Sequence, residues 1–154
     1  WSRTTSNAFK GYPVIDKDGN IYAGNQDGQL YAYTSTGSLK WTFPLNGFSS
    51  SSPAIDHNGN IYIGSGSGEL FSISKNGDMN WSFYTDGPVR TAPLIDAKGT
   101  VYFGSDDMKV YAADANGNEL WSYQTDSNVV SSPQLAEDGT LYIGSYTKLM
   151  AFGK

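Results

Sequence analysis

The sequence contains no cysteine and a single histidine, and these shortages limit the chemistry that the chain can perform. Without cysteine there is no disulfide framework, no thiolate nucleophile and no cysteine zinc site. His57 lies in a turn rich in Asn and Gly, and no nucleophile motif accompanies it. We therefore expect no catalytic role for His57.

Charged residues and long apolar runs are also scarce. Charged residues make up 16% of the chain, against about 25% in an average protein. The net charge is −5 and no basic block occurs, so neither nucleic acid nor an anionic membrane is expected as a partner. No apolar run approaches the ~20 residues that span a bilayer. We expect a soluble chain, and the residues given show no export leader.

Glycine and aromatic residues are plentiful. The chain has 18 Gly and 6 Pro, and the longest stretch without either runs from Asn118 to Ser132. Helices rarely tolerate these residues in their interior, so an all-α fold is excluded. Aromatic residues make up 14% of the chain, which indicates a packed core.

Five columns of residues recur every 40 positions. They are Trp1, Trp41, Trp81 and Trp121; Pro13, Pro53, Pro93 and Pro133; Gly19, Gly59, Gly99 and Gly139; Tyr22, Tyr62, Tyr102 and Tyr142; and Gly24, Gly64, Gly104 and Gly144. A fixed period of this length marks a repeat architecture. We therefore divide a single unit, 1–154, into repeats at about 12–51, 52–91, 92–131 and 132–154.

Each repeat predicts four short strands. In the second repeat they cover 54–56, 61–65, 69–74 and 79–83, and turns containing Gly or Asn separate them. One such meander has two apolar faces, and stacking successive copies around an axis hides both. The sequence therefore predicts an all-β fold: a β-propeller of four-stranded antiparallel blades, with four repeats in the chain.

The repeat resembles a known family. The segments DGNIYAGNQDGQLYAYTSTGSLKW (18–41) and KGTVYFGSDDMKVYAADANGNELW (98–121) are similar to the pyrroloquinoline-quinone-type, or tryptophan-docking, propeller repeat. The resemblance covers essentially the whole chain, and it implies a propeller and a periplasmic or extracellular location. The enzymes of the family add an adjacent cysteine pair, calcium ligands, a catalytic Asp and long loops, none of which matches here. We therefore expect a non-enzymatic binding or scaffolding module with no cofactor, and the alternative is a quinone- and calcium-binding element of a dehydrogenase.

The number of blades in the ring follows from packing distances. Facing sheets lie about 10 Å apart, so four blades crowd the axis whereas eight leave a channel. We expect residues 1–11 to supply the outer strand that the last repeat lacks, and two chains to close one eight-bladed ring by exchanging it. The alternative is a four-bladed monomer with splayed outer strands. The regular spacing also favours a half-propeller or an engineered fragment of a larger one.

Two groups of residues are candidates for defined roles. The four tryptophans are expected to pack between blades. The Asp-x-x-Gly turns, such as 16–19, lack the spacing of a calcium loop, so we interpret these residues as turn formers and expect no metal site.

The connections between repeats differ in sequence while the framework residues stay constant, and loops on a rigid scaffold usually carry recognition. We therefore expect this loop face to bind a protein or peptide, or else a small acidic ligand, through Phe9, Lys10, Phe48 and Arg90.

Overall fold

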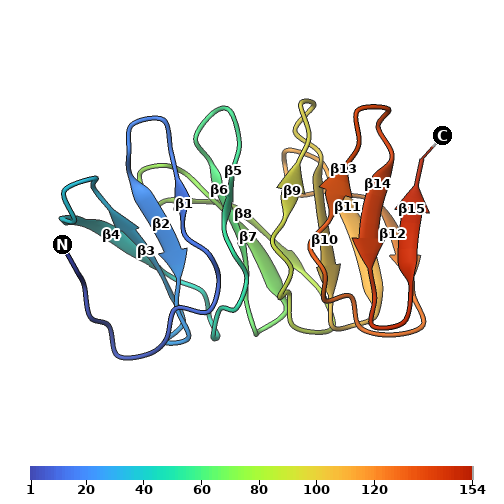
Figure 1. Ribbon diagram of the computed structural model, residues 1–154, viewed down its shortest axis with the longest axis horizontal. Coiled ribbons are helices and arrows are strands. Elements are labelled where there is room, and N and C mark those ends of the chain that lie inside the picture. Colours follow the sequence, from blue (N-terminus) through green and yellow to red (C-terminus); the bar gives the residue numbers. More distant parts are fainter. Residues whose placement is uncertain (154) are drawn as a thin grey trace.

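The computed structural model describes residues 1–153, and all of its regular elements are strands, which confirms the all-β prediction. The strands form four antiparallel sheets that stand side by side in sequence order (Figure 1). Sheet 1 comprises β1 (Val14–Ile15), β2 (Ile21–Gly24), β3 (Gln29–Tyr33) and β4 (Leu39–Pro44); sheet 2 comprises β5 (Ala54–Ile55), β6 (Ile61–Gly64), β7 (Glu69–Ile73) and β8 (Met79–Tyr84); sheet 3 comprises β9 (Leu94–Ile95), β10 (Val101–Ser105), β11 (Lys109–Ala113) and β12 (Glu119–Gln124); sheet 4 comprises β13 (Gln134–Leu135), β14 (Leu141–Gly144) and β15 (Leu149–Phe152).

Every sheet is a meander in which each strand pairs with the next one in the chain. The strands of sheet 2 agree with the predicted ranges to within one residue at each end. The third and fourth strands of the first three sheets share a register irregularity, which falls between Ala32 and Tyr33 in sheet 1 and at the equivalent positions of sheets 2 and 3. The first three repeats therefore have the same strand pairing as well as similar sequences, and they share this irregularity.

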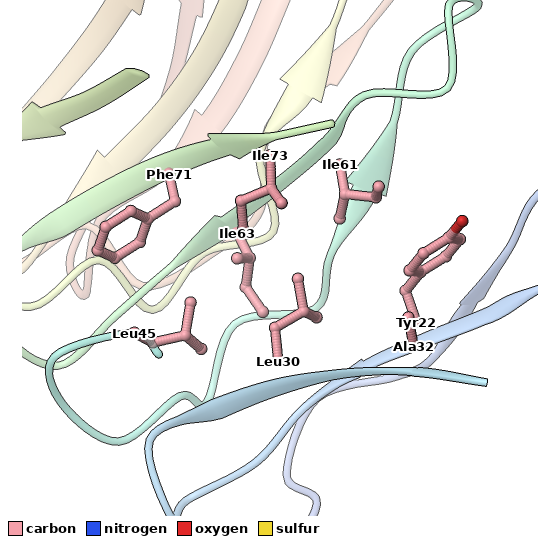
Figure 2. Close-up of a cluster of buried hydrophobic side chains, with 8 residues drawn as sticks. All are labelled: Tyr22, Leu30, Ala32, Leu45, Ile61, Ile63, Phe71 and Ile73. Carbon is pink, nitrogen blue, oxygen red and sulfur yellow. The ribbon is translucent and has the colours of Figure 1, made fainter. Parts of the chain in front are cut away.

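The hydrophobic core lies between the sheets. Side chains of sheet 1 meet side chains of sheet 2, and Figure 2 shows Leu30 and Tyr22 facing Ile63 and Ile61 across this interface. A second cluster joins sheets 2 and 3, and a third joins sheets 3 and 4. Because residues of a strand alternate between its two faces, Ile61 and Ile63 point toward sheet 1 while Tyr62 belongs to the cluster with sheet 3. The middle sheets are thus covered on both faces.

The sheets at the two ends of the array each have one face that no other sheet covers. On sheet 4, the exposed fractions are 42% for Tyr142 and 78% for Leu149. The equivalent residues of sheet 1, Tyr22 and Leu30, are only 1% and 0% exposed because sheet 2 covers them. Sheet 4 therefore exposes to solvent residues whose equivalents in sheet 1 are buried against the next sheet.

Residues 1–11 form no strand within the single chain, and they lie against sheet 1. The N- and C-termini stand at opposite ends of the array (Figure 1). Within residues 1–153, β15 pairs only with β14, so sheet 4 has three strands. In this structure the chain is therefore an open array, with its first and last sheets at opposite ends.

None of the described residues is helical, so no segment within 1–153 forms an apolar helix long enough to cross a membrane.

Candidate functional site

One edge of the array gathers the connections between sheets and the turns that join the second strand of each sheet to the third (Figure 1). Each connection is tied to the neighbouring turn through its backbone. In each repeat, a backbone amide of the turn donates a hydrogen bond to a carbonyl oxygen of the connection. The four bonds are Gln26 to Ala8 at 3.0 Å, Gly66 to Phe48 at 2.7 Å, Asp106 to Pro88 at 2.8 Å and Tyr146 to Asn128 at 3.3 Å. We call this surface the loop face, and its backbone is fixed by the repeat while its side chains vary.

Phe48 and Arg90 lie together on the loop face. The guanidinium carbon of Arg90 stands 5.0 Å from the centre of the Phe48 ring. Its Nε also donates a 2.6 Å hydrogen bond to Asp106 Oδ2, which makes an ion pair. Because Asp106 neutralises this cation, Arg90 and Phe48 form a flat aromatic and cationic surface with little net charge.

Phe9 occupies a different part of the loop face. Its ring packs edge-on against Tyr31 at 5.9 Å and remains 40% exposed. Lys10 follows it and is exposed. The structure thus brings two of the four predicted residues, Phe48 and Arg90, into contact, whereas Phe9 and Lys10 lie beside sheet 1.

The sequence analysis missed two carboxylate–phenol pairs on this face. The hydroxyl of Tyr31 donates to Asp27 Oδ2 at 2.7 Å, and that of Tyr111 donates to Asp107 Oδ2 at 2.6 Å. Burial and this hydrogen bond raise the pKa of Tyr31 to about 12, and they raise the pKa of Tyr111 as well. The signal was present in the sequence, because an Asp precedes a Tyr by four residues in both repeats. These phenols remain protonated and orient the turns.

A second set of carboxylates lies in the turns that join the first two strands of each sheet. Asp56 Oδ1 accepts the amides of Asn58 and Asn60, and Oδ2 accepts Asn60 Nδ2 and the Tyr62 hydroxyl, all at 2.9–3.0 Å. Burial raises the pKa of the Asp56 carboxyl, but these hydrogen bonds outweigh it and hold the pKa below its usual value. Both oxygens are occupied by donors of this turn. Within residues 1–153, no three His, Asp or Glu side chains are grouped as metal ligands.

Replacing Asp56 with Asn should lower the free energy of unfolding by about 1–3 kcal/mol at neutral pH, because an amide cannot accept all of these donors. The folded-state pKa of Asp56 is depressed, so its contribution is present above the unfolded pKa and is lost as the pH falls through the folded one. Urea unfolding at neutral and acidic pH should therefore show a smaller acid-induced loss in D56N than in the parent.

The fourth repeat supplies the matched control for this substitution, since it carries Ala136 where the others carry Asp. Ala136→Asp adds a carboxylate within reach of the Tyr142 position and should act in the opposite direction, raising stability at neutral pH. Equal stability of D56N and the parent at neutral pH would contradict the role assigned to this turn.

The tryptophans of the repeat lie where one sheet meets the next. Trp41 Nε1 donates to the Lys75 carbonyl at 3.1 Å, and Trp81 Nε1 donates to the Ala115 carbonyl at 2.9 Å. The Trp41 ring lies against Gly77, whose φ is +93° and where an added Cβ would come within 2.9 Å of the ring. Both indoles are half-buried, which is less than the full burial expected for a core residue. They link a strand of one sheet to a turn of the next.

Trp1 makes the same contact with sheet 1, although it belongs to no strand. Its Nε1 donates to the Ser35 carbonyl at 3.0 Å, and its ring lies against Gly37. The carbonyl that accepts this hydrogen bond lies 34 residues after the tryptophan, as it does for Trp41 and Trp81. Trp1 and Phe9 also line an open apolar hollow of about 200 Å³ over Ile21, Ala23 and Tyr33 of sheet 1. The exposed fraction of Trp1 is nevertheless 65%.

Four meander sheets stacked face to face, linked by tryptophans and joined by short loops on one edge, define a module of the β-propeller class. The family model of the outer membrane protein assembly factor BamB matches residues 1–58 and 49–153. The chain therefore belongs to this family of PQQ-type repeat proteins, as the sequence resemblance predicted.

Solved structures agree with this assignment. BamB from Moraxella catarrhalis is 25% identical with a TM-score of 0.82, and the match covers 97% of this chain and 48% of that one. The computationally designed Ika4 protein is 16% identical with a TM-score of 0.81, over 97% and 93% of the two chains. The designed Ika8 protein is 15% identical with a TM-score of 0.79, over 96% and 46%. No curated protein sequence matches significantly. The chain thus spans about half the length of the BamB structure.

Proposed function

We propose that this chain is a non-catalytic binding or scaffolding module of the BamB type. The observation that carries the proposal is the loop face, where the connections are short and several polar side chains are held by ion pairs or hydrogen bonds. Arg90 is paired with Asp106, and Tyr31 and Tyr111 are paired with Asp27 and Asp107. These pairs hold the side chains of the surface in place for contact with a partner. The relatives found are an assembly factor and designed propellers, and the family supports a periplasmic, outer-membrane-associated location.

We further propose that the module works as a half-propeller, with two copies closing one eight-bladed ring. The two end faces that no other sheet covers support this assembly, because in a ring of two copies each of them meets a sheet of the other copy.

The partner of the loop face would be a protein or peptide. Phe48 with the stacked Arg90 offers an aromatic and planar cationic anchor of the kind that dominates protein interfaces. Phe9, beside Tyr31, offers a second aromatic anchor, and Lys10 adds a free positive charge next to it. The surface fits a segment with apolar and aromatic side chains better than a small acidic ligand, because Asp106 already neutralises Arg90.

A displayed library of random peptides, selected on the intact protein, tests the loop face directly. We expect the enriched peptides to lose at least about ten-fold in affinity when Phe9, Phe48 and Arg90 are all replaced by Ala, since the aromatic and Arg anchors carry most of the binding energy. Circular dichroism should show that the variant is folded. Replacing Lys17, His57 and Lys98, which lie in turns outside the loop face, is the control and should leave affinity unchanged. Enriched peptides that bind both variants equally would reject the loop face as the contact surface.

The alternative function, a quinone- and calcium-binding element of a dehydrogenase, has its own test. Pyrroloquinoline quinone and Ca²⁺ are titrated into the protein, and binding is followed by absorbance. We expect no saturation at stoichiometric ratio. Saturable one-to-one binding would replace the scaffolding proposal with the quinoprotein alternative.

A further inference from the structure

We infer that the N-terminal residues of one copy pair with β15 of a second copy in a single antiparallel register, with Ser2 directly opposite Met150. This inference rests on the proposed two-copy ring and specifies its interface. The same register places Arg3 opposite Leu149 and Trp1 opposite Ala151. The N-terminal segment then supplies the fourth strand of sheet 4 in the other copy.

The register follows from the repeat. In sheet 1, β3 pairs with β4 so that Tyr31 lies opposite Thr42. Pairing of β14 with β15 matches that of β2 with β3, so that Met150 occupies the position of Tyr31. The 40-residue period makes Ser2 the equivalent of Thr42. Sheets 2 and 3 repeat this register, with Phe71 opposite Ser82 and Tyr111 opposite Ser122.

The N-terminal segment is already held in the position of a fourth strand and the connection that follows it. Trp1 is bound to sheet 1 as Trp41 is bound to sheet 2. Further along, the Thr5 hydroxyl donates to the Asn7 carbonyl, and the Thr85 hydroxyl donates to the equivalent carbonyl of Gly87. Asn25 then reaches Thr5 as Ser105 reaches Thr85. Relative to sheet 1, residues 1–8 therefore lie where the end of a preceding sheet would lie.

The two end faces match the faces that the repeat buries internally. On sheet 4, Tyr142 and Leu149 occupy the positions of Tyr22 and Leu30, which sheet 2 covers completely. On sheet 1, the face that no other sheet covers carries the equivalents of the sheet 2 residues that meet sheet 1; these are Ile21, Ala23, Tyr31 and Tyr33. Trp1 and Phe9 of the same chain lie over part of this face. The interface between two copies would therefore repeat the contacts of the internal interface between sheets 1 and 2. Because both end faces carry the residues of an internal interface, we take a second copy of the chain as the partner that covers each of them.

Disulfide trapping tests the register, because the chain has no cysteine of its own. The matched variant carries Ser2→Cys and Met150→Cys. The N-terminus and β15, the strand that contains Met150, lie at opposite ends of the array (Figure 1), so a bond between the two cysteines joins two copies. The control variant carries Thr4→Cys and Met150→Cys, a pair displaced by two residues. Directly opposed strand residues have Cα atoms about 4.5–5.5 Å apart and diagonal pairs about 7–8 Å apart, which exceeds the reach of a disulfide.

We expect mild oxidation to give at least about ten-fold more linked dimer from the matched variant than from the control. Equal yields from the two variants, or no linked dimer from a particle that contains two copies, would overturn the register and leave the two-copy ring in place. A particle of one copy at every concentration would remove the ring and the register together.

Amide exchange in the unaltered protein gives an independent readout that does not depend on introduced cysteines. The amides of 149–152 that point away from β14 should exchange more slowly as protein concentration rises, since they would donate to the partner's strand. Exchange that is independent of concentration in a two-copy particle would also overturn the pairing.

Discussion

Replacing Trp81 with Ala is expected to lower the free energy of unfolding by about 3 kcal/mol, at the lower end of the range for removing a large core aromatic. Its ring lies 5.8 Å from that of Tyr62 and packs against Gly117, and its Nε1 is bound to the Ala115 carbonyl. The substitution removes all three contacts at the junction of sheets 2 and 3. The half-burial of the indole keeps the expected loss below that of a fully buried Trp.

Urea unfolding followed by circular dichroism measures this loss. Trp81→Phe is the matched control, because it keeps an aromatic ring and removes only the indole N–H and part of the packing. We expect it to lose about 1 kcal/mol, the typical contribution of one hydrogen bond. A loss below about 1 kcal/mol in W81A would show that the tryptophan contact is not needed to hold neighbouring sheets together.

Deleting residues 1–11 is expected to convert the protein from a defined assembly into aggregates. The deletion uncovers the face of sheet 1 beneath Trp1 and Phe9, and it leaves β15 of every copy without an outer strand. An unpaired strand edge with exposed apolar side chains, such as Leu149, templates pairing with other chains. Static light scattering over time, at equal concentrations of the intact and truncated chains, follows the change.

A charge placed on that edge provides the control for the deletion. Leu149→Lys in the truncated chain should suppress the aggregation, because lysine on an edge strand opposes pairing with further strands. The account would be contradicted by a truncated chain that stays soluble with the same mass in solution as the intact chain.

The sheets were predictable because the signals that define them are local. The strands that follow the first one in each sheet are short runs rich in β-branched and aromatic residues and bounded by turn residues, as in Ile61–Gly64, and the 40-residue period shows which turns are equivalent. The invariant spacing of the tryptophans likewise placed Trp41 and Trp81 at junctions between sheets.

The contacts on the loop face were only partly predictable. Arg90 and Phe48 come from different connections, and the ion pair of Arg90 with Asp106 depends on how a connection folds over a turn of the next sheet. Variation among repeats identifies such residues as candidates for binding, but it does not show which side chains they contact within the chain. The Asp107–Tyr111 pair was within reach of sequence reasoning, because it repeats the spacing of Asp27 and Tyr31.

Residues 1–11 illustrate a different limit. The period identifies them as the equivalent of an outer strand, yet a strand forms only where a neighbouring strand offers its hydrogen-bonding groups. In the single chain that neighbour, β15, lies at the far end of the array. The sequence therefore predicts that the segment is the equivalent of an outer strand, whereas its register needs the strand pairings of the structure.

The mass of the protein in solution tests the central claim most directly. Sedimentation equilibrium across a hundred-fold range of concentration should give twice the chain mass of 16.7 kDa, with dissociation only at the lowest concentrations. Stability toward urea should rise with concentration over the same range, since closure of the ring joins two copies. A particle of 16.7 kDa throughout, with unfolding independent of concentration, would contradict the two-copy ring.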